Sequence, residues 1–265
     1  MKNRSIFKRN RPGYEIRNKS EKEPTEIFLY DEIGFWGVTA EAFAKDLKAI
    51  KNAVTIRINS PGGSVFDGVA MYKAISDFKN PTTTIIDGLA ASAASYVALA
   101  GDTVQMSEGA FMMIHDPYSM VVGTSGDMRK EADLLDKIRD EIAGFYVRKS
   151  EKSIDEIVAM MAEETWLNGE DAVEFGLVDE VLKKDPVKNS FDLTIYNNVP
   201  DVLTSSEDCG MQKPKVLENA LRDAGLSRRE AKTVLSNGLK ALTLNQPEDD
   251  DIWAGLTKLH LSVKG

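Results

Sequence analysis

The chain has 265 residues, of which 42% are hydrophobic, and this size suits one domain of about 150–200 residues with additional segments. The single cysteine, Cys209, excludes an intramolecular disulfide and a cysteine-cluster metal site. No apolar run reaches the roughly 18–20 residues of a membrane span, and no secretory signal is visible. The net charge of −9 argues against general nucleic-acid binding. We therefore expect a cytoplasmic protein with no membrane or nucleic-acid partner.

The N-terminal segment differs in charge from the rest of the chain. Residues 1–22 contain eight Lys/Arg and two Glu. This composition predicts a solvated basic arm over residues 1–24, with a docking arm or a removable propeptide as alternatives.

Strand and helix patterns alternate from residue 26 onward, which argues for an α/β domain with parallel strand pairing. Thr39 and Ser64 are the predicted N-caps of the first two helices, the second with Asp67 as the acid of a capping-box-like start. In chain order, the patterns predict strands at 26–30, 53–58, 82–87, 103–106, 110–115 and 177–182, and helices at 39–50, 64–78, 88–101, 127–149, 153–161 and 168–176.

The pattern changes beyond residue 184, so the main domain is predicted over residues 25–184. Residues 185–213 are rich in turn formers and lack periodicity, which predicts a linker. Residues 214–265 predict a helical C-terminal tail, in which Gly225 separates two short helices. The tail faintly resembles a helix-turn-helix, but its charge balance does not favour DNA binding.

A Pro-Gly-Gly turn is the first of three motifs with chemical potential. In INSPGGSV the turn joins a strand to a capped helix, where free backbone N–H groups and the helix dipole favour an oxyanion. The segment lacks the GxxxxGK[ST] pattern of a phosphate loop. Taken alone, it also fits an ordinary tight turn.

The second motif, GLAASAAS, places Ser92 after a strand and a turn, at the start of a helix. A hydroxyl at that position is exposed to a field that favours developing negative charge, although the sequence is not GxSxG. Ser95 is predicted to lie inside the helix and to bond back to the carbonyl four residues earlier. Serines in an alanine-rich helix are also consistent with packing alone.

The third motif, MMIHDP, places His115 at the end of an apolar strand. The only other histidine, His260, lies in the predicted tail, so a histidine-rich metal site is not expected, and no cofactor is predicted. Asp116 is a poor candidate to orient His115 because neighbouring strand side chains point to opposite faces. A nucleophile, a base and donor turns at the strand ends of one α/β unit together indicate acyl transfer.

Four motifs, INSPGG, GLAASAAS, MMIHDP and WLNGEDAVEFGLVDEVL, resemble the Clp protease proteolytic subunit (ClpP) family in order and approximate spacing. The resemblance covers residues 26–183. Within the family, ETWLNG, YDEIGFWGVTA and LRDAGLSRREAK are most similar to phage- and prophage-encoded head maturation (prohead) proteases. The implied fold is the ClpP/crotonase-type spiral of ββα units, followed here by a linker and a helical tail.

The resemblance implies a role for each motif residue. Ser92 is expected to be the nucleophile and His115 the general base, with oxyanion N–H groups from Gly63 and Ala93. The family commonly has Met where this chain has Ala93, a change without consequence for a backbone donor.

The third catalytic position departs from the family pattern. The family's aspartate aligns with Glu164, which has the same charge on a longer arm and is expected to orient the Nδ1–H of His115. If Glu164 faces away, Thr165 or a two-residue dyad is the alternative.

The resemblance also implies a function. We expect an ATP-independent serine endopeptidase that forms homo-oligomeric rings, with the 127–149 helix pairing subunits between rings. Its expected substrates are capsid or scaffold proteins, cleaved in the host cytoplasm or within the prohead.

Four other functional hypotheses stay open. They are a ClpP-like subunit served by a separate unfoldase, a crotonase-type acyl-CoA enzyme, a Ser-Lys peptidase using Lys73 or Lys79, and a capsid-assembly role for residues 214–265.

Overall fold

The computed structural model describes residues 14–18, 20, 23–183 and 191–204, all within one compact unit. The predictions for residues 1–13 and for the tail, including Cys209 and His260, lie outside the described residues.

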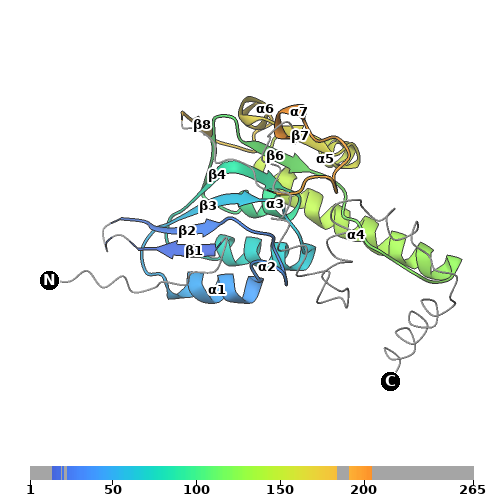
Figure 1. Ribbon diagram of the computed structural model, residues 1–265, viewed down its shortest axis with the longest axis horizontal. Helices are drawn as coiled ribbons and strands as arrows, with labels where there is room; N and C mark the ends of the chain where they lie inside the picture. The colour runs from blue at the N-terminus through green and yellow to red at the C-terminus, as the bar shows by residue number, and fades with distance from the viewer. Residues whose placement is uncertain (1–13, 19, 21–22, 184–190, 205–265) are drawn as a thin grey trace, which may run out of the picture. The chain divides into compact units, whose positions relative to one another are not determined.

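The described strands form one eight-stranded sheet (Figure 1). Its order is β1-β2-β3-β4-β5-β8, with β6 beside β4 and β7 beside β6. All neighbours pair in parallel except β1 with β2 and β6 with β7, so the predicted α/β class with parallel pairing is confirmed. The strands are β1 Tyr14–Arg17, β2 Thr25–Leu29, β3 Val54–Ser60, β4 Thr82–Ala91, β5 Thr103–Ser107, β6 Phe111–Ile114, β7 Thr165–Leu167 and β8 Glu180–Leu182.

The helices begin at the predicted caps. The side chain of Thr39 accepts from the N–H of Ala42, and that of Ser64 accepts from Asp67. The carboxylate of Asp67 accepts instead from the N–H of Ala40, which joins the starts of the first two helices. The helices are α1 Ala40–Ala49, α2 Val65–Ser76, α3 Ala93–Ala98, α4 Ser125–Lys149, α5 Ile154–Ala162, α6 Gly169–Glu174 and α7 Asp201–Thr204.

Two hydrophobic clusters use alternate residues of the central strands. Ala90 and Met112 belong to the large core, which includes buried residues of α1, α2 and α3; Figure 1 shows α1 and α2 side by side against the β1–β3 part of the sheet. Ala91 and Met113, each the next residue along its strand, belong to a smaller cluster. Residues 191–204 pack on this smaller cluster and bury Tyr196 there.

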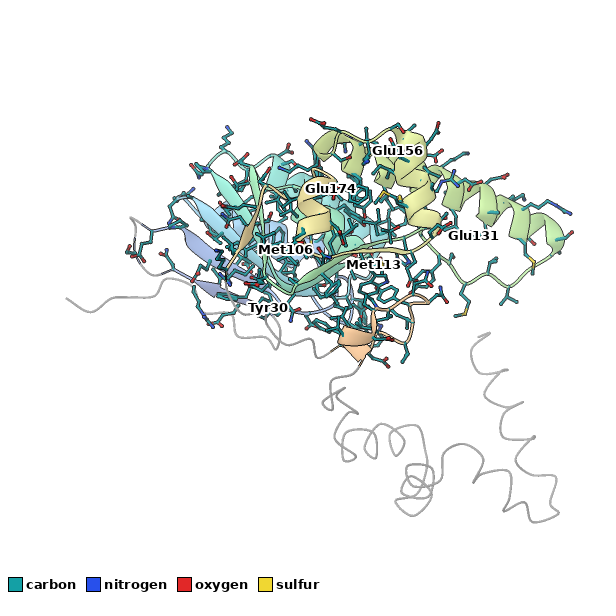
Figure 2. The ribbon with its side chains drawn as sticks, turned by 90° about the horizontal axis from the view of Figure 1, so that it is seen from above. Tyr30, Met106, Met113, Glu131, Glu156 and Glu174 are labelled. Carbon is teal, nitrogen blue, oxygen red and sulfur yellow. The ribbon has the colours of Figure 1, made fainter. Side chains whose placement is uncertain are left out.

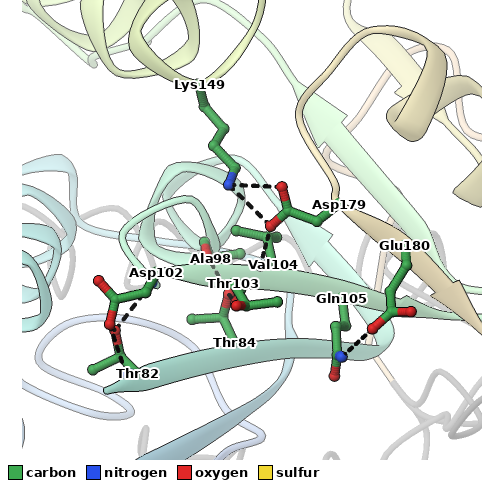
Figure 3. A network of polar contacts seen from close by, with 10 residues as sticks. All are labelled: Thr82, Thr84, Ala98, Asp102, Thr103, Val104, Gln105, Lys149, Asp179 and Glu180. Carbon is green, nitrogen blue, oxygen red and sulfur yellow. Dashed lines mark hydrogen bonds and ion pairs between the residues drawn. The ribbon is translucent and has the colours of Figure 1, made fainter. Parts of the chain in front are cut away.

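Polar contacts fix α3 to the sheet beneath it (Figure 3). The hydroxyl of Thr84 on β4 donates to the carbonyl of Ala98 at 2.6 Å, at the end of α3. Asp179 accepts from the N–H of Val104 at 2.7 Å and pairs with Lys149 at 3.0 Å, which joins the end of α4 to β5 and β8. The Thr84 contact therefore fixes the end of α3, the helix that follows Ser92, to β4.

The long helix α4 changes character along its length. Its C-terminal half buries Ile142, Ala143 and Tyr146, whereas Leu134 is 47% exposed. Figure 2 shows Glu131 on the part of α4 that extends beyond the sheet, and Met106 and Met113 in the interior.

The structure differs from the sequence prediction between residues 88 and 101. This stretch was assigned to a helix that Ser92 opens after a strand and a turn. The helix α3 does begin directly after Ser92 and covers Ala93–Ala98, whereas β4 continues to Ala91. The helix assignment is wrong for residues 88–91 because Leu89, Ala90 and Ala91 pair with β6, with Ala90 buried in the large core and Leu89 and Ala91 in the smaller cluster.

Two strands were not anticipated. Tyr14–Arg17, inside the stretch interpreted as a solvated arm, pairs with β2 and buries Tyr14 and Ile16. Thr165–Leu167 pairs antiparallel with β6. Both are very short, and pairing with a neighbouring strand decides their conformation more than local pattern does.

Candidate active site

Ser92 occupies the abrupt junction between β4 and α3. Its backbone has φ 53° and ψ −124°, a conformation that costs a non-glycine residue about 1–3 kcal/mol. The junction is held because the N–H of Ser92 donates to the carbonyl of Met113 at 2.9 Å on β6. Such strain at an exposed hydroxyl is typical of a nucleophile.

Ser95 has a separate role. Its hydroxyl donates to the carbonyl of Ser92 at 2.5 Å, three residues earlier rather than the predicted four, and lies 2.7 Å from the hydroxyl of Tyr146. Ser95 is fully buried, so it fixes the junction instead of facing the cleft.

The Pro-Gly-Gly turn packs directly against Ser92. Gly62 has φ +94°, and a Cβ there would lie 2.7 Å from the Cβ of Ser92. Gly63 has φ +139°, and a Cβ there would lie 2.1 Å from the carbonyl oxygen of Ile33. Only glycine fits either position, so one predicted oxyanion donor, Gly63, lies on a closely packed turn, and the other, Ala93, is the first residue of α3. The N–H groups of Gly63 and Ala93 have no hydrogen-bond acceptor among the described residues.

Ser92 and His115 form a hydrogen-bonded pair. The Nε2 of His115 lies 2.8 Å from the Oγ of Ser92, across 23 residues of sequence. Burial lowers the pKa of His115 below its usual value of 6.5, and the nearby charge of Glu164 partly opposes this shift. The imidazole is therefore neutral near pH 7 and is able to accept the proton of Ser92.

Glu164 lies near this pair but makes its hydrogen bonds elsewhere. Its carboxylate accepts from the backbone N–H of Asn197 at 2.9 Å and of Asn198 at 2.6 Å, and from the indole of Trp166 at 3.2 Å. Burial favours a higher pKa for Glu164, but these donors and His115 outweigh it and lower the pKa. No hydrogen bond joins Glu164 to His115 in the described part of the chain. Glu164 acts on His115 through its charge.

Neither Thr165, the alternative orienting residue, nor Asp116 makes a hydrogen bond to the imidazole of His115. The hydroxyl of Thr165 donates to the carbonyl of Met160 at 2.6 Å. Asp116 makes no hydrogen bond to the imidazole, and its buried Oδ1 has no partner among the described residues. Burial raises the pKa of Asp116. Of the acidic side chains near His115, Glu164 is the one with an electrostatic effect on the imidazole.

A cleft of about 540 Å³ opens beside the serine–histidine pair. None of its described lining residues is a lysine. Lys73, a candidate base of the Ser-Lys alternative, is paired with Asp77 on the exposed end of α2. The cleft is lined by the Pro-Gly-Gly turn, the serine–histidine pair and residues from three more segments: Asp31, Glu32, Pro61, Gly62, Gly63, Ser64, Val65, Ser92, His115, Pro117, Tyr118, Phe191, Asp192, Ile195 and Tyr196.

Sequence reasoning missed the contribution of residues 191–198. These residues were placed in a linker, yet Tyr196 lines the cleft and the next two residues hold Glu164. Turn-forming composition without periodicity gave no signal of this contact.

Across the described ranges, no group of three or more His, Cys, Asp or Glu side chains is arranged to bind a metal ion. Within the same ranges, no helix has both the length and the apolar character to cross a membrane.

A serine on a strained strand–helix junction, bonded to a neutral imidazole and adjacent to free backbone donors, has the geometry typical of serine hydrolases. The family model for Clp protease matches residues 14–185. The chain therefore belongs to the Clp protease family, as its sequence motifs indicated.

Individual relatives agree with this assignment. The chain is 33% identical over 134 residues to ATP-dependent Clp protease proteolytic subunit 1 of Prochlorococcus marinus, covering 50% of this chain and 68% of the relative. It is 33% identical over 133 residues to the ATP-dependent Clp protease proteolytic subunit of Bacteroides fragilis, covering 49% and 64%. The matched segments thus span about two thirds of these relatives' own lengths.

A solved structure shares the fold. A mutant of ClpP1 from Listeria monocytogenes aligns with a TM-score of 0.52 at 25% identity, covering 58% of this chain and 89% of that one. The predicted ClpP-like α/β fold is confirmed.

Proposed function

We propose that this protein is a serine endopeptidase in which Ser92 is the nucleophile and His115 the general base. The observation that carries the proposal is the 2.8 Å contact between Ser92 Oγ and His115 Nε2, at a strained junction beside free N–H donors. Family membership supports the same chemistry, since the relatives are named proteolytic subunits.

The geometry suits acyl transfer to serine. Ser92 Oγ attacks the peptide carbonyl carbon while its proton passes to His115 Nε2. The carbonyl oxygen becomes an oxyanion that accepts hydrogen bonds from the N–H groups of Gly63 and Ala93. The imidazolium then protonates the leaving amine as the C–N bond breaks. A water molecule, deprotonated by His115, hydrolyses the resulting ester and restores the hydroxyl of Ser92.

Glu164 supports this cycle through its charge. The imidazolium formed in each half-reaction is positive, and a buried carboxylate nearby stabilises it. Because no hydrogen bond is formed to His115, we assign Glu164 an electrostatic role rather than the tautomer-fixing role of a directly bonded acid.

A fluorophosphonate label followed by peptide mapping tests the proposal. Ser92 should be the labelled residue, Ser92→Ala should abolish labelling, and Ser76→Ala, an exposed serine at the end of α2, should leave it unchanged. Labelling at another residue, or none in the assembled protein, would overturn the assignment. A crotonase-type enzyme should largely retain acyl-CoA turnover in Ser92→Ala.

The Ser-Lys alternative has less support than the Ser-His pair. Lys73 and Lys79 both line a separate hollow between α1 and α2, not the cleft of Ser92. Peptide hydrolysis retained in His115→Ala would restore this alternative.

We further propose assembly into homo-oligomeric rings through α4. Leu134 and Met128 on its N-terminal half are 47% and 50% exposed, which suits a helix that pairs with another subunit. Mass measurement in solution tests this proposal, and Leu134→Asp should weaken the assembly.

For the biological substrate, we propose capsid or scaffold proteins processed during phage head maturation. The sequence segments ETWLNG, YDEIGFWGVTA and LRDAGLSRREAK support this narrower assignment. No Walker motif is present in the sequence, so a ClpP-like subunit served by a separate unfoldase is the competing role. If the tail directs capsid incorporation, deleting residues 214–265 should spare peptide hydrolysis and abolish incorporation into proheads.

A further inference from the structure

Three consecutive residues beyond the last described strand contact three parts of the candidate active site. Tyr196 contacts the oxyanion turn and His115, and Asn197 and Asn198 bind Glu164. The family model ends at residue 185, so these contacts come from a part of the chain that the family domain does not include.

The first contact reaches the oxyanion turn. The hydroxyl of Tyr196 donates to the carbonyl oxygen of Pro61 at 2.5 Å, across 135 residues of sequence. Pro61 precedes Gly62 and Gly63, which have no side chains of their own. The Gly62 peptide is otherwise held by the N–H of Ile33, which donates to its carbonyl at 2.7 Å, and by Ser60 Oγ, which accepts from its N–H at 3.1 Å. The hydrogen bond from Tyr196 adds a restraint on the peptide units that present the N–H of Gly63.

The second contact reaches the base. The ring of Tyr196 lies edge-on to the imidazole of His115, with ring centroids 5.4 Å apart and an interplanar angle of 83°. The ring of Tyr196 also lies edge-on to that of Trp166, with ring centroids 5.9 Å apart. Tyr196 is only 8% exposed, so it limits the rotation of His115 away from Ser92 and helps to shield the imidazole from water.

The third contact reaches the acid. Each oxygen of the Glu164 carboxylate accepts a backbone N–H, one from Asn197 and one from Asn198. Glu164 itself has φ 52°, so its position depends on tertiary contacts and not on local preference. The side chain of Asn198 also donates to the carbonyl of Glu163 at 2.8 Å, which adds a second attachment at the same corner.

We propose that Tyr196, Asn197 and Asn198 are positioning residues. They hold the oxyanion turn, the base and the acid of this enzyme in fixed positions relative to one another. The proposal rests on the proposed serine peptidase function and deepens it. It makes the catalytic unit of this chain extend past the family domain to residue 198. The segment leaves Ser92 accessible, because the 540 Å³ cleft stays open beside it.

The hydroxyl of Tyr196 gives the sharpest test. Tyr196→Phe keeps the ring and removes the bond to Pro61, and Tyr72→Phe removes a phenol hydroxyl on α2, away from the cleft, as a matched control. For Tyr196→Phe we expect about a tenfold fall in kcat and in the rate of fluorophosphonate labelling of Ser92, because one oxyanion donor is less well placed. KM should stay within about twofold, as for an interaction made mainly in the transition state.

A structural role alone would give a different result. Loss of packing would lower the thermal midpoint without a separate effect on kcat, so labelling is compared at a temperature where all variants are folded. Tyr196→Leu, which also removes the ring, should lower the labelling rate further than Tyr196→Phe.

The outcomes separate the two proposals. Wild-type labelling at Ser92 with an equal rate in Tyr196→Phe would overturn the positioning role and leave the peptidase assignment intact. An absence of labelling in the wild-type protein would overturn both.

Discussion

The two sides of the candidate active site are built differently. On the nucleophile side, Ser92, Gly62 and His115 lie at the ends of β4, β3 and β6, three strands that pair directly in the centre of the sheet. On the acid side, Glu164 precedes the short strand β7 and is held by a segment that begins some 30 residues later. The nucleophile side is fixed by regular sheet pairing, whereas the acid side depends on hydrogen bonds from a segment that is distant in the sequence.

This difference predicts unequal consequences of substitution. Residues on the nucleophile side take part in bond making, so their loss should remove most of the activity. Residues on the acid side act through charge and position, so their loss should reduce the rate without abolishing it.

The largest effect is expected at the base. His115→Ala should lower kcat/KM for a peptide substrate by about 10⁴-fold, since no other described residue is hydrogen-bonded to Ser92 Oγ as a base. His260→Ala provides the matched control and should hydrolyse peptide at the wild-type rate. A loss of less than about tenfold in His115→Ala would mean that another group accepts the proton.

An intermediate effect is expected at Glu164. Glu164→Gln should lower kcat by about 10- to 100-fold, less than removal of a directly bonded acid, because the carboxylate acts through charge. The same change should move the acidic limb of the kcat/KM profile to lower pH. The negative charge raises the pKa of His115, so its removal lowers that pKa further below 6.5.

The matched control for this variant is Thr165→Val, whose hydroxyl bonds Met160 and not the imidazole. The pH–rate profiles of both variants are compared with wild type. An acidic limb that shifts upward in Glu164→Gln, or a larger loss in Thr165→Val, would contradict the assigned role of Glu164.

The smallest effect is one of stability. Ser92→Gly should raise the free energy of unfolding by about 1 kcal/mol while abolishing activity, because glycine adopts φ 53° without strain. Urea denaturation measures the difference, with Ser92→Ala as the inactive variant that keeps the strain. Equal stability of the two variants would show that the junction stores no strain.

Sequence patterns predicted more of the nucleophile side of the site than of the acid side. The motifs around Ser92 and His115 were predicted to meet at strand ends, and they lie within hydrogen-bond distance. The caps at Thr39 and Ser64 were also confirmed, since capping depends on residues three apart in the chain. The prediction that Ser92 opens the small-residue helix was confirmed, whereas the assignment of residues 88–91 to that helix was wrong because pairing with β6, not local propensity, extends β4 to Ala91.

Sequence alone therefore determined the family, the parallel α/β class and the candidate nucleophile and base, since these follow from local motifs and strand periodicity. Only the tertiary structure decided what Glu164 contacts and that Tyr196 borders the cleft. The physical reason is that the segment 191–198 has no repeating pattern of its own, so its conformation is fixed by burial of Tyr196 and by hydrogen bonds to a distant carboxylate.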